Sequence, residues 1–114
     1  MTRVTFLYRR GRPYGFRASG HAGYADSGED IVCAAISALT QTCELGLTEK
    51  LGLDVEVQRD DERGFYELTT PGIPGRRQRR EAAILFDTLL IGLESIRSSY
   101  PEYLRINAKE RRWN

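Results

Sequence analysis

The feature that most constrains the fold is an abrupt change of pattern at Gly28, inside the stretch from Gly20 to Leu39. The residues before Gly28 are mostly Gly, Ala, Asp and Ser, which favour loops and turns. After it, apolar residues recur at spacings of three and four. This stripe predicts an amphipathic helix from about Glu29 to Leu51, the longest element of the core, which ends at Gly52.

Two cysteines lie on this helix, and the apolar stripe separates their roles. Cys43 belongs to the stripe, so we interpret it as a small buried apolar residue. Cys33 lies off the stripe, on a separate polar edge with Asp30 and Ser37. Ser27 and Asp30 are both N-cap candidates, and either cap places Cys33 within about two turns of the helix start. Free N–H groups and the macrodipole stabilise an anion there, so Cys33 is the candidate nucleophile.

His21, the one histidine in the chain, follows a predicted strand and precedes a loop that is long enough to fold back over the helix start. An imidazole near Cys33 could take the thiol proton and later protonate a leaving amine. The alternative is structural: a packing role for His21, an N-cap role for Asp30 and a helix-surface hydroxyl for Ser37. Zinc bound by His21, Cys33 and Cys43 is disfavoured, because structural zinc normally has four protein ligands. We expect no cofactor.

The rest of the pattern predicts one α+β domain over residues 1–114. Apolar and polar residues alternate, as in half-buried strands, in five segments: residues 2–9, 14–19, 53–58, 65–70 and 103–107. Residues 82–99 form a second amphipathic helix, and residues 109–114 form a tail. The order strand-strand-helix-strand-strand-helix-strand favours a mostly antiparallel sheet of four to five strands, packed with two helices.

Composition narrows the choice of partners and compartment. The net charge is only +1 at pH 7, so bulk electrostatics favours neither an acidic nor a basic partner. The first ten residues lack the apolar core of a signal peptide, and no apolar run approaches the length of a membrane span. We therefore expect a cytoplasmic protein without a membrane partner, in which both cysteines remain thiols.

Two segments carry the chemistry suggested above: Gly20-His21-Ala22, and Gly28-Glu29-Asp30-Ile31-Val32-Cys33-Ala34-Ala35-Ile36-Ser37-Ala38-Leu39. Together they closely resemble the signature of the bacterial ribosomal-processing cysteine protease family, called Prp. The resemblance implies a cysteine-type endopeptidase with His21 as proton donor and base, Cys33 as nucleophile, and Asp30 and Ser37 in support. It also implies a substrate, the N-terminal extension of a large-subunit ribosomal protein (protein twenty-seven), cut after Phe during ribosome assembly.

Further expectations concern substrate contacts and assembly. Gly20, Gly23 and Gly28 would let the backbone approach a substrate strand closely. A surplus of apolar residues on the second helix, at Ile84, Leu85 and Ile91, predicts a homodimer, which the resemblance also implies.

Two loops and an arginine run leave alternatives open. Residues 22–28 and 71–75 would act either as lids over a bound peptide or as simple connectors. Residues 76–80 carry four arginines, which we interpret as a solvated face. On the alternative they bind ribosomal RNA, and the protein is a non-enzymatic ribosome- or RNA-binding module. A redox-sensing thiol protein is a second alternative; the preferred enzyme needs no nucleic acid.

Overall fold

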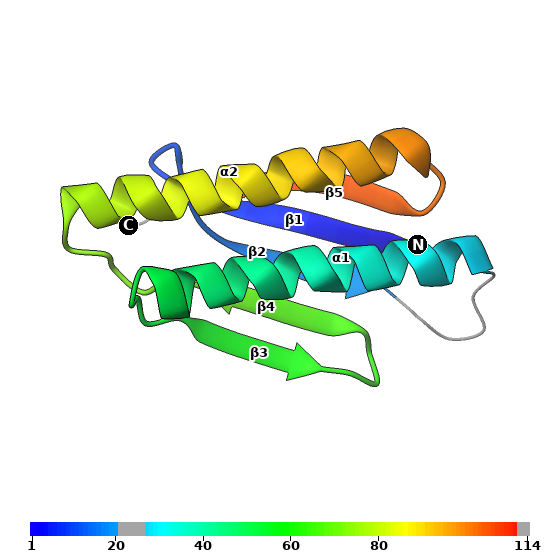
Figure 1. Cartoon of the computed structure of the whole chain (residues 1–114), viewed down its shortest axis with the longest axis horizontal. Coiled ribbons are helices and arrows are strands. Elements are labelled where there is room, and N and C mark those ends of the chain that lie inside the picture. The colour runs from blue at the N-terminus through cyan, green and yellow to red at the C-terminus, as the bar shows by residue number, and fades with distance from the viewer. Residues whose placement is uncertain (21–26, 112–114) are drawn as a thin grey trace.

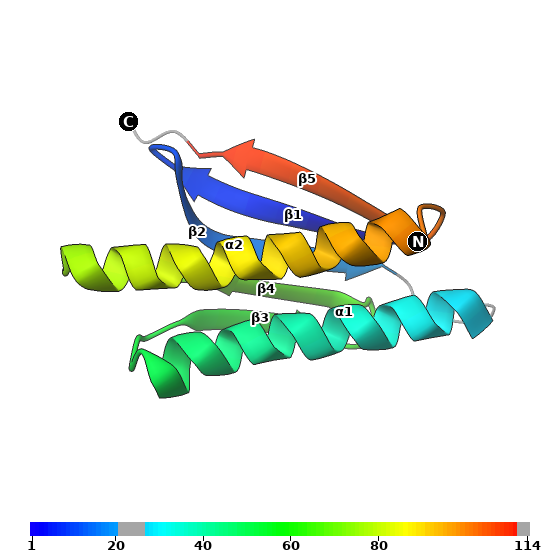
Figure 2. The same cartoon turned by 45° about the horizontal axis from the view of Figure 1, so that its top comes forward.

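The computed structural model describes residues 1–20 and 27–111, and it places two helices on one face of a five-stranded sheet (Figures 1 and 2). The strands are β1 (Thr2–Arg9), β2 (Arg12–Gly20), β3 (Glu56–Asp60), β4 (Phe65–Thr69) and β5 (Leu104–Glu110). The helices are α1 (Ser27–Leu45), which continues into the short π-helical segment η1 (Gly46–Lys50), and α2 (Arg76–Ser99). The architecture confirms the predicted α+β fold and element order.

The sheet has the strand order β3-β4-β2-β1-β5. The two hairpins and the β2–β4 pair are antiparallel, whereas β5 runs parallel to β1 at the edge of the sheet. β1 is therefore a central strand, with Thr2 between Gly20 of β2 and Leu104 of β5. The predicted last strand was too short, because Lys109 and Glu110, expected in a tail, also pair with β1.

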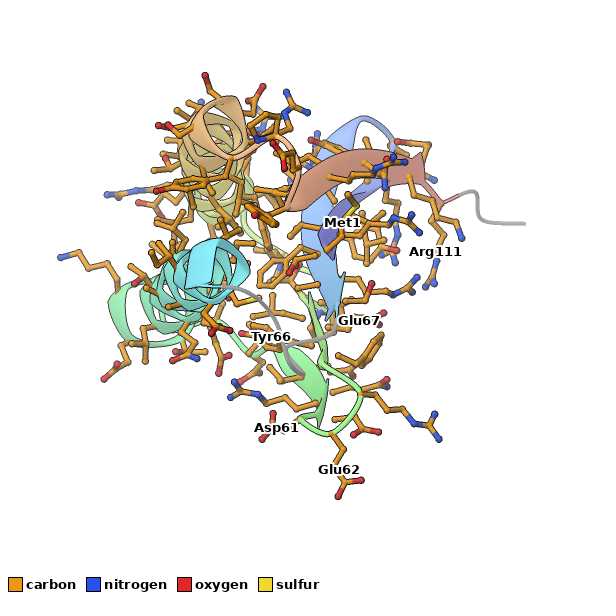
Figure 3. The ribbon with its side chains drawn as sticks, turned by 90° about the vertical axis from the view of Figure 1, so that its right-hand side faces the viewer. Met1, Asp61, Glu62, Tyr66, Glu67 and Arg111 are labelled. Carbon is orange, nitrogen blue, oxygen red and sulfur yellow. The ribbon has the colours of Figure 1, made fainter. Side chains whose placement is uncertain are left out.

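The core lies between the sheet and the helix layer. Its largest fully buried side chains are aromatic and aliphatic: Phe6, Phe16, Phe86, Leu47, Leu68, Leu93 and Leu104. The ring of Phe16 meets those of Tyr66 and Phe86 edge to face, at centroid distances of 5.4 and 6.4 Å. Seen along the sheet, Tyr66 lies on the helix side and Glu67 on the opposite side (Figure 3). One face of the sheet thus carries the core, as strand alternation requires.

The first helix is the core helix of the fold. Within Asp30–Lys50, an 18-residue window has a mean hydropathy of 1.4, over a length that could cross a membrane. By length and composition, the expectation that no apolar run reaches a membrane span is therefore wrong. Val32, Ile36 and Leu47 of this stretch are nevertheless buried against the sheet. The chain turns away at Gly52, whose positive φ of 66° suits the predicted helix end.

A bulge in the first hairpin changes one predicted side-chain position. Leu7 pairs with Gly15 and Tyr8 with Pro13, so Tyr14 is the extra residue of β2. An extra residue reverses the alternation locally. The alternation predicted over residues 14–19 places Tyr14 on the same face as Phe16 and Ala18. Tyr14 is buried but lies outside the core cluster that contains Phe16 and Ala18, so this part of the prediction is wrong.

Candidate functional site

The candidate nucleophile contacts the first strand. Cys33 is the seventh residue of α1 and is partly exposed. Its Sγ lies 3.5 Å from Oγ1 of Thr2, at the start of β1. In the thiol form either atom can donate this hydrogen bond, but a thiolate can only accept it. The Thr2 hydroxyl is therefore placed to stabilise the ionised sulfur.

Thr2 is held firmly in this position. Its side chain is 7% exposed, and its backbone N–H donates to the carbonyl oxygen of Tyr103, 2.9 Å away. Strands on both sides fix the backbone of β1 here. Sequence reasoning missed Thr2, because it contacts Cys33 across 31 positions of the chain, between the start of β1 and α1, and no local pattern signals such a contact.

Cys33 and Thr2 lie in the wall of a cavity of about 160 Å³. Side chains with polar or ionisable groups reach its wall from β1, β2, α1 and the β3–β4 hairpin. They include Thr2, Ser19, Cys33, Ser37, Arg59, Asp61 and Tyr66. Ala18, Ile36 and Phe65 add apolar surface. The cavity thus combines the candidate nucleophile, hydroxyls, a cation and a carboxylate with apolar surface. Such a lining suits a peptide segment, whose backbone is polar and whose side chain can be apolar.

The wall opposite the helix is formed by the β3–β4 hairpin, which the sequence predicted only as strands and a turn. The Tyr66 hydroxyl donates to a carboxylate oxygen of Glu44 on α1. Burial, and then this hydrogen bond to Glu44, raise the pKa of Tyr66 well above its ordinary value. The Arg59 guanidinium lies 4.8 Å above the Tyr66 ring centroid, in a cation–π contact. These contacts tie the hairpin to the helix that carries Cys33.

The helix N-terminus acts on Cys33 less directly than the sequence implied. α1 begins at Ser27, so Asp30 lies inside its first turn, and the N-cap role considered for Asp30 is wrong. Cys33 lies six residues beyond the first helical residue, about 9 Å along the axis. The macrodipole acts mainly on the first turn, so the Thr2 hydroxyl is the closer source of stabilisation.

The other predicted site residues fall in different places. Ser37 lines the cavity one turn after Cys33, whereas Asp30 is exposed and does not line it. At Gly20 a side chain would put its Cβ 2.7 Å from Met1 O and Thr2 Cα, so strand pairing alone requires glycine there. Gly28 is the second residue of α1. His21 and Gly23 lie outside the described residues.

Cys43 has the opposite environment from Cys33. It is 6% exposed and belongs to the core cluster, which confirms its interpretation as a buried apolar residue. Burial, with a smaller contribution from Glu44, raises the pKa of its thiol from 9.0 to about 12. Such a thiol is unreactive near neutral pH. Within residues 1–20 and 27–111, no group of three or more His, Cys, Asp or Glu residues could hold a metal ion.

Comparison with known proteins points to one family. A family model described as "Cysteine protease Prp" matches residues 1–105. The chain is 25% identical over 91 residues to the ribosomal processing cysteine protease Prp of Bacillus subtilis, covering 80% of this chain and 81% of that protein. It is 30% identical over 93 residues to the Staphylococcus aureus protein of that name, covering 79% and 81%.

Solved structures agree with this likeness. SMU.848 from Streptococcus mutans superposes with a TM-score of 0.83 at 27% identity, over 97% of this chain and 96% of that one. The S. aureus protease Prp with a covalently linked product peptide gives a TM-score of 0.80 at 25% identity, over 96% and 100%. The same protease with a substrate peptide gives 0.83 at 24% identity, over 96% and 100%, which bears on the fold alone.

Proposed function

Because the chain belongs to the cysteine protease Prp family, we propose that it is a cysteine endopeptidase whose nucleophile is Cys33 and whose acid–base group is His21. The observation that carries the proposal is the contact between the Cys33 sulfur and the Thr2 hydroxyl in the wall of a cavity. Of the two cysteines, only this one combines exposure with a hydrogen-bond donor suited to a thiolate.

The order of events follows from the residue types. Cys33, having given its proton to His21, attacks a peptide carbonyl carbon and forms a C–S bond. Collapse of the tetrahedral intermediate breaks the C–N bond, and His21 protonates the departing amine. Water, activated by His21, then hydrolyses the thioester and restores the thiol. Gly20, which precedes His21, packs against Thr2 at the cavity, and this neighbourhood supports the pairing of His21 with Cys33.

The proposed substrate is the N-terminal extension of a large-subunit ribosomal protein (protein twenty-seven), cleaved after Phe in the cytoplasm during ribosome assembly. Two relatives that are named as ribosomal processing proteases support this choice. The structure adds that Ile36, Phe65 and Tyr66 line the cavity, so an aromatic substrate side chain would meet apolar and aromatic surface.

The decisive experiment is incubation of the protein with the extended ribosomal protein from the same bacterium, followed by mass measurement of the products. We expect a single cut after Phe, which Cys33→Ala and His21→Ala each abolish and Cys43→Ala leaves in place. Cleavage that survives Cys33→Ala would contradict the proposed nucleophile. Binding of RNA with no cleavage by the unmodified protein would favour the non-enzymatic alternative.

We also propose that the protein is a homodimer that associates through its helix layer. Ile84 and Ile91 lie on one side of α2 and are 62% and 67% exposed. Ile31 and Leu45 on α1 are exposed as well. Leu85, expected in the same surplus, instead packs on the core near Gly46. Light scattering should give twice the chain mass, and Ile84→Glu with Ile91→Glu should give monomers; a strict monomer before mutation would contradict the proposal.

A further inference from the structure

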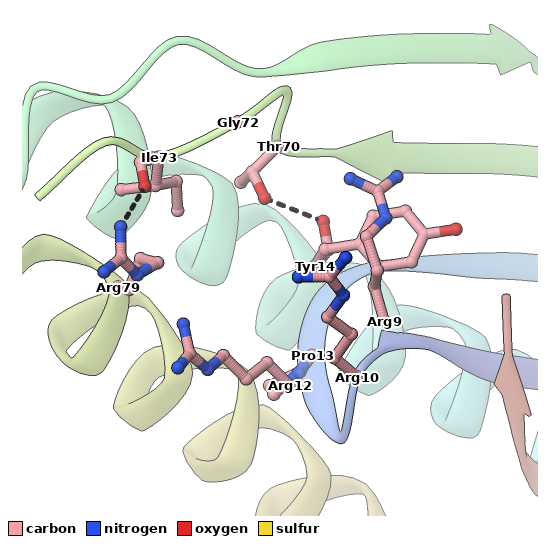
Figure 4. Close-up of a pocket in the computed structure, with 9 residues that line it drawn as sticks. All are labelled: Arg9, Arg10, Arg12, Pro13, Tyr14, Thr70, Gly72, Ile73 and Arg79. Atoms are coloured by element: carbon pink, nitrogen blue, oxygen red, sulfur yellow. Dashed lines mark hydrogen bonds between the residues drawn. The ribbon is translucent and has the colours of Figure 1, made fainter. Parts of the chain in front are cut away.

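A second cavity, larger than the one beside Cys33, lies at the other end of β1 (Figure 4). Its volume is about 600 Å³, within the usual range of small-molecule sites. Thr2 and Arg9 mark the two ends of the strand, so seven residues, or about 23 Å, separate the two sites. The cavity lies between the β1–β2 turn and the connection from β4 to α2.

Arginine dominates this cavity. Arg9, Arg10 and Arg12 come from the first hairpin, and Arg79 comes from the first turn of α2. None of the nine described residues that line the cavity is acidic. At the neighbouring turn the carboxylate of Glu110 accepts a hydrogen bond from the N–H of Gly11 at 3.2 Å. Four guanidinium groups in a lining without an acidic residue among those described make the site strongly positive.

Local packing orients two of these arginines. The Arg9 guanidinium lies 4.4 Å above the centroid of the Tyr14 ring, and Tyr14 is 7% exposed. Arg79 donates through Nη1 to the carbonyl oxygens of Ile73 and Pro74, both at 2.8 Å. In the described part of the chain, the buried Arg79 Nε and the buried Tyr14 hydroxyl have no hydrogen-bond partner. A buried donor without a partner is costly, and a ligand oxygen bound beside Arg79 would satisfy its Nε.

The hairpin turn supplies an independent indication. Arg10 has a φ of +55°, and it is the one described residue other than glycine with a positive φ. Such two-residue turns strongly favour Asn-Gly or Gly-Gly, since the left-handed conformation is unfavourable for a long side chain. Backbone strain of this kind is typical of functional sites. Here the strained residue places a cation at the cavity rim.

We infer that this arginine cavity binds a phosphate-bearing ligand. Guanidinium groups bind phosphate oxygens in pairs of parallel hydrogen bonds, which distinguishes such a site from a diffuse cationic surface. The volume suits two or more linked phosphates better than one. Pro13 and Ile73 add an apolar wall for an attached group. The phosphates come either from a free di- or triphosphate or from an RNA strand, and this inference does not depend on the proposed protease activity.

The test measures binding to the full chain carrying Cys33→Ala, so that proteolysis plays no part. Pyrophosphate is titrated by calorimetry, and a short fluorescent oligouridylate by anisotropy. Arg10→Asn removes one cation while relieving the positive φ, so it should weaken binding about fivefold without lowering the melting temperature. Arg12→Gln should weaken binding similarly. Arg97→Gln, which removes the same charge from the last turn of α2, is the matched control.

The outcomes distinguish a free phosphate compound from RNA as the ligand, and they also show when the inference fails. Tighter binding of pyrophosphate than of oligouridylate identifies a free phosphate compound, and the reverse order identifies RNA. In either case both variants at the cavity must lose affinity while Arg97→Gln keeps it. An equal loss of affinity for Arg97→Gln would mean that the net charge of the protein, and not the cavity, binds the probe, and this would overturn the inference. The absence of saturable binding of either probe at millimolar concentration would also overturn it.

Discussion

Replacing Thr2 by valine should slow the chemistry of Cys33 about tenfold. The substitution keeps the β-branched shape that suits a strand and removes only the hydroxyl that lies 3.5 Å from the sulfur. A hydrogen bond to a charged group contributes about 1.5 to 3 kcal/mol, and the long, partly buried contact here favours the lower value. At about 1.4 kcal/mol per factor of ten, its loss corresponds to about one order of magnitude in rate.

Two assays report this effect directly: the rate at which iodoacetamide alkylates Cys33 at neutral pH, and the rate of peptide cleavage. Both should fall together in Thr2→Val, and Thr2→Ser should restore most of each rate. Thr5→Val is the matched control, because Thr5 lies on the opposite face of the same strand. Unchanged alkylation in Thr2→Val, or an equal loss in Thr5→Val, would refute the role given to the hydroxyl.

Three further predictions concern the cysteines and the core. Cys33→Ala should abolish cleavage with little change in melting temperature, whereas Cys43→Ala should retain cleavage and lose about 1 to 2 kcal/mol of unfolding free energy in urea; inactivity of Cys43→Ala in a folded protein would contradict this division. The unfolding free energy should decrease as the pH rises from about 9 towards 12, because the unfolded chain gives up the Cys43 proton at a lower pH than the native state, whose thiol has a pKa of about 12. Below pH 9 this stabilisation is fully present, the total loss is at most about 4 kcal/mol, and a flat urea profile across this range would count against the burial argument. Phe86→Ala should cost about 3 to 5 kcal/mol in the same assay, since its fully buried ring packs against Phe16; a cost below about 1 kcal/mol would show that the core does not depend on this ring.

The elements that the sequence predicted well are those defined by local patterns. The stripe from Val32 to Leu51 and the glycine that follows it identified the core helix, whose end at Gly52 has the expected backbone conformation. Alternation identified both hairpins, because a sheet with one buried face imposes a period of two. The same stripe correctly separated the buried cysteine from the partly exposed one.

What the sequence did not predict depends on contacts between distant residues. Thr2 and Cys33 are 31 positions apart in the chain, and the packing of α1 on the sheet brings them together (Figure 1). The parallel pairing that borders Thr2 on the other side, with β5, spans almost the whole chain. The arginine cavity likewise joins the first hairpin to Arg79, which belongs to the run 76–80 that we interpreted as a solvated face. The bulge that moves Tyr14 away from the core follows from hairpin register, which the alternation alone could not reveal.

The pairing of β1 with β5 has a consequence for substitutions far from Cys33. β5 forms one of the two borders of the strand that holds Thr2, and the carbonyl oxygen of Tyr103, just before β5, accepts from the backbone N–H of Thr2. Without this border, the start of β1 would be paired with β2 alone. Changes that weaken the pairing of β5 should therefore loosen the Thr2 hydroxyl beside Cys33, although no described residue of β5 lines that cavity.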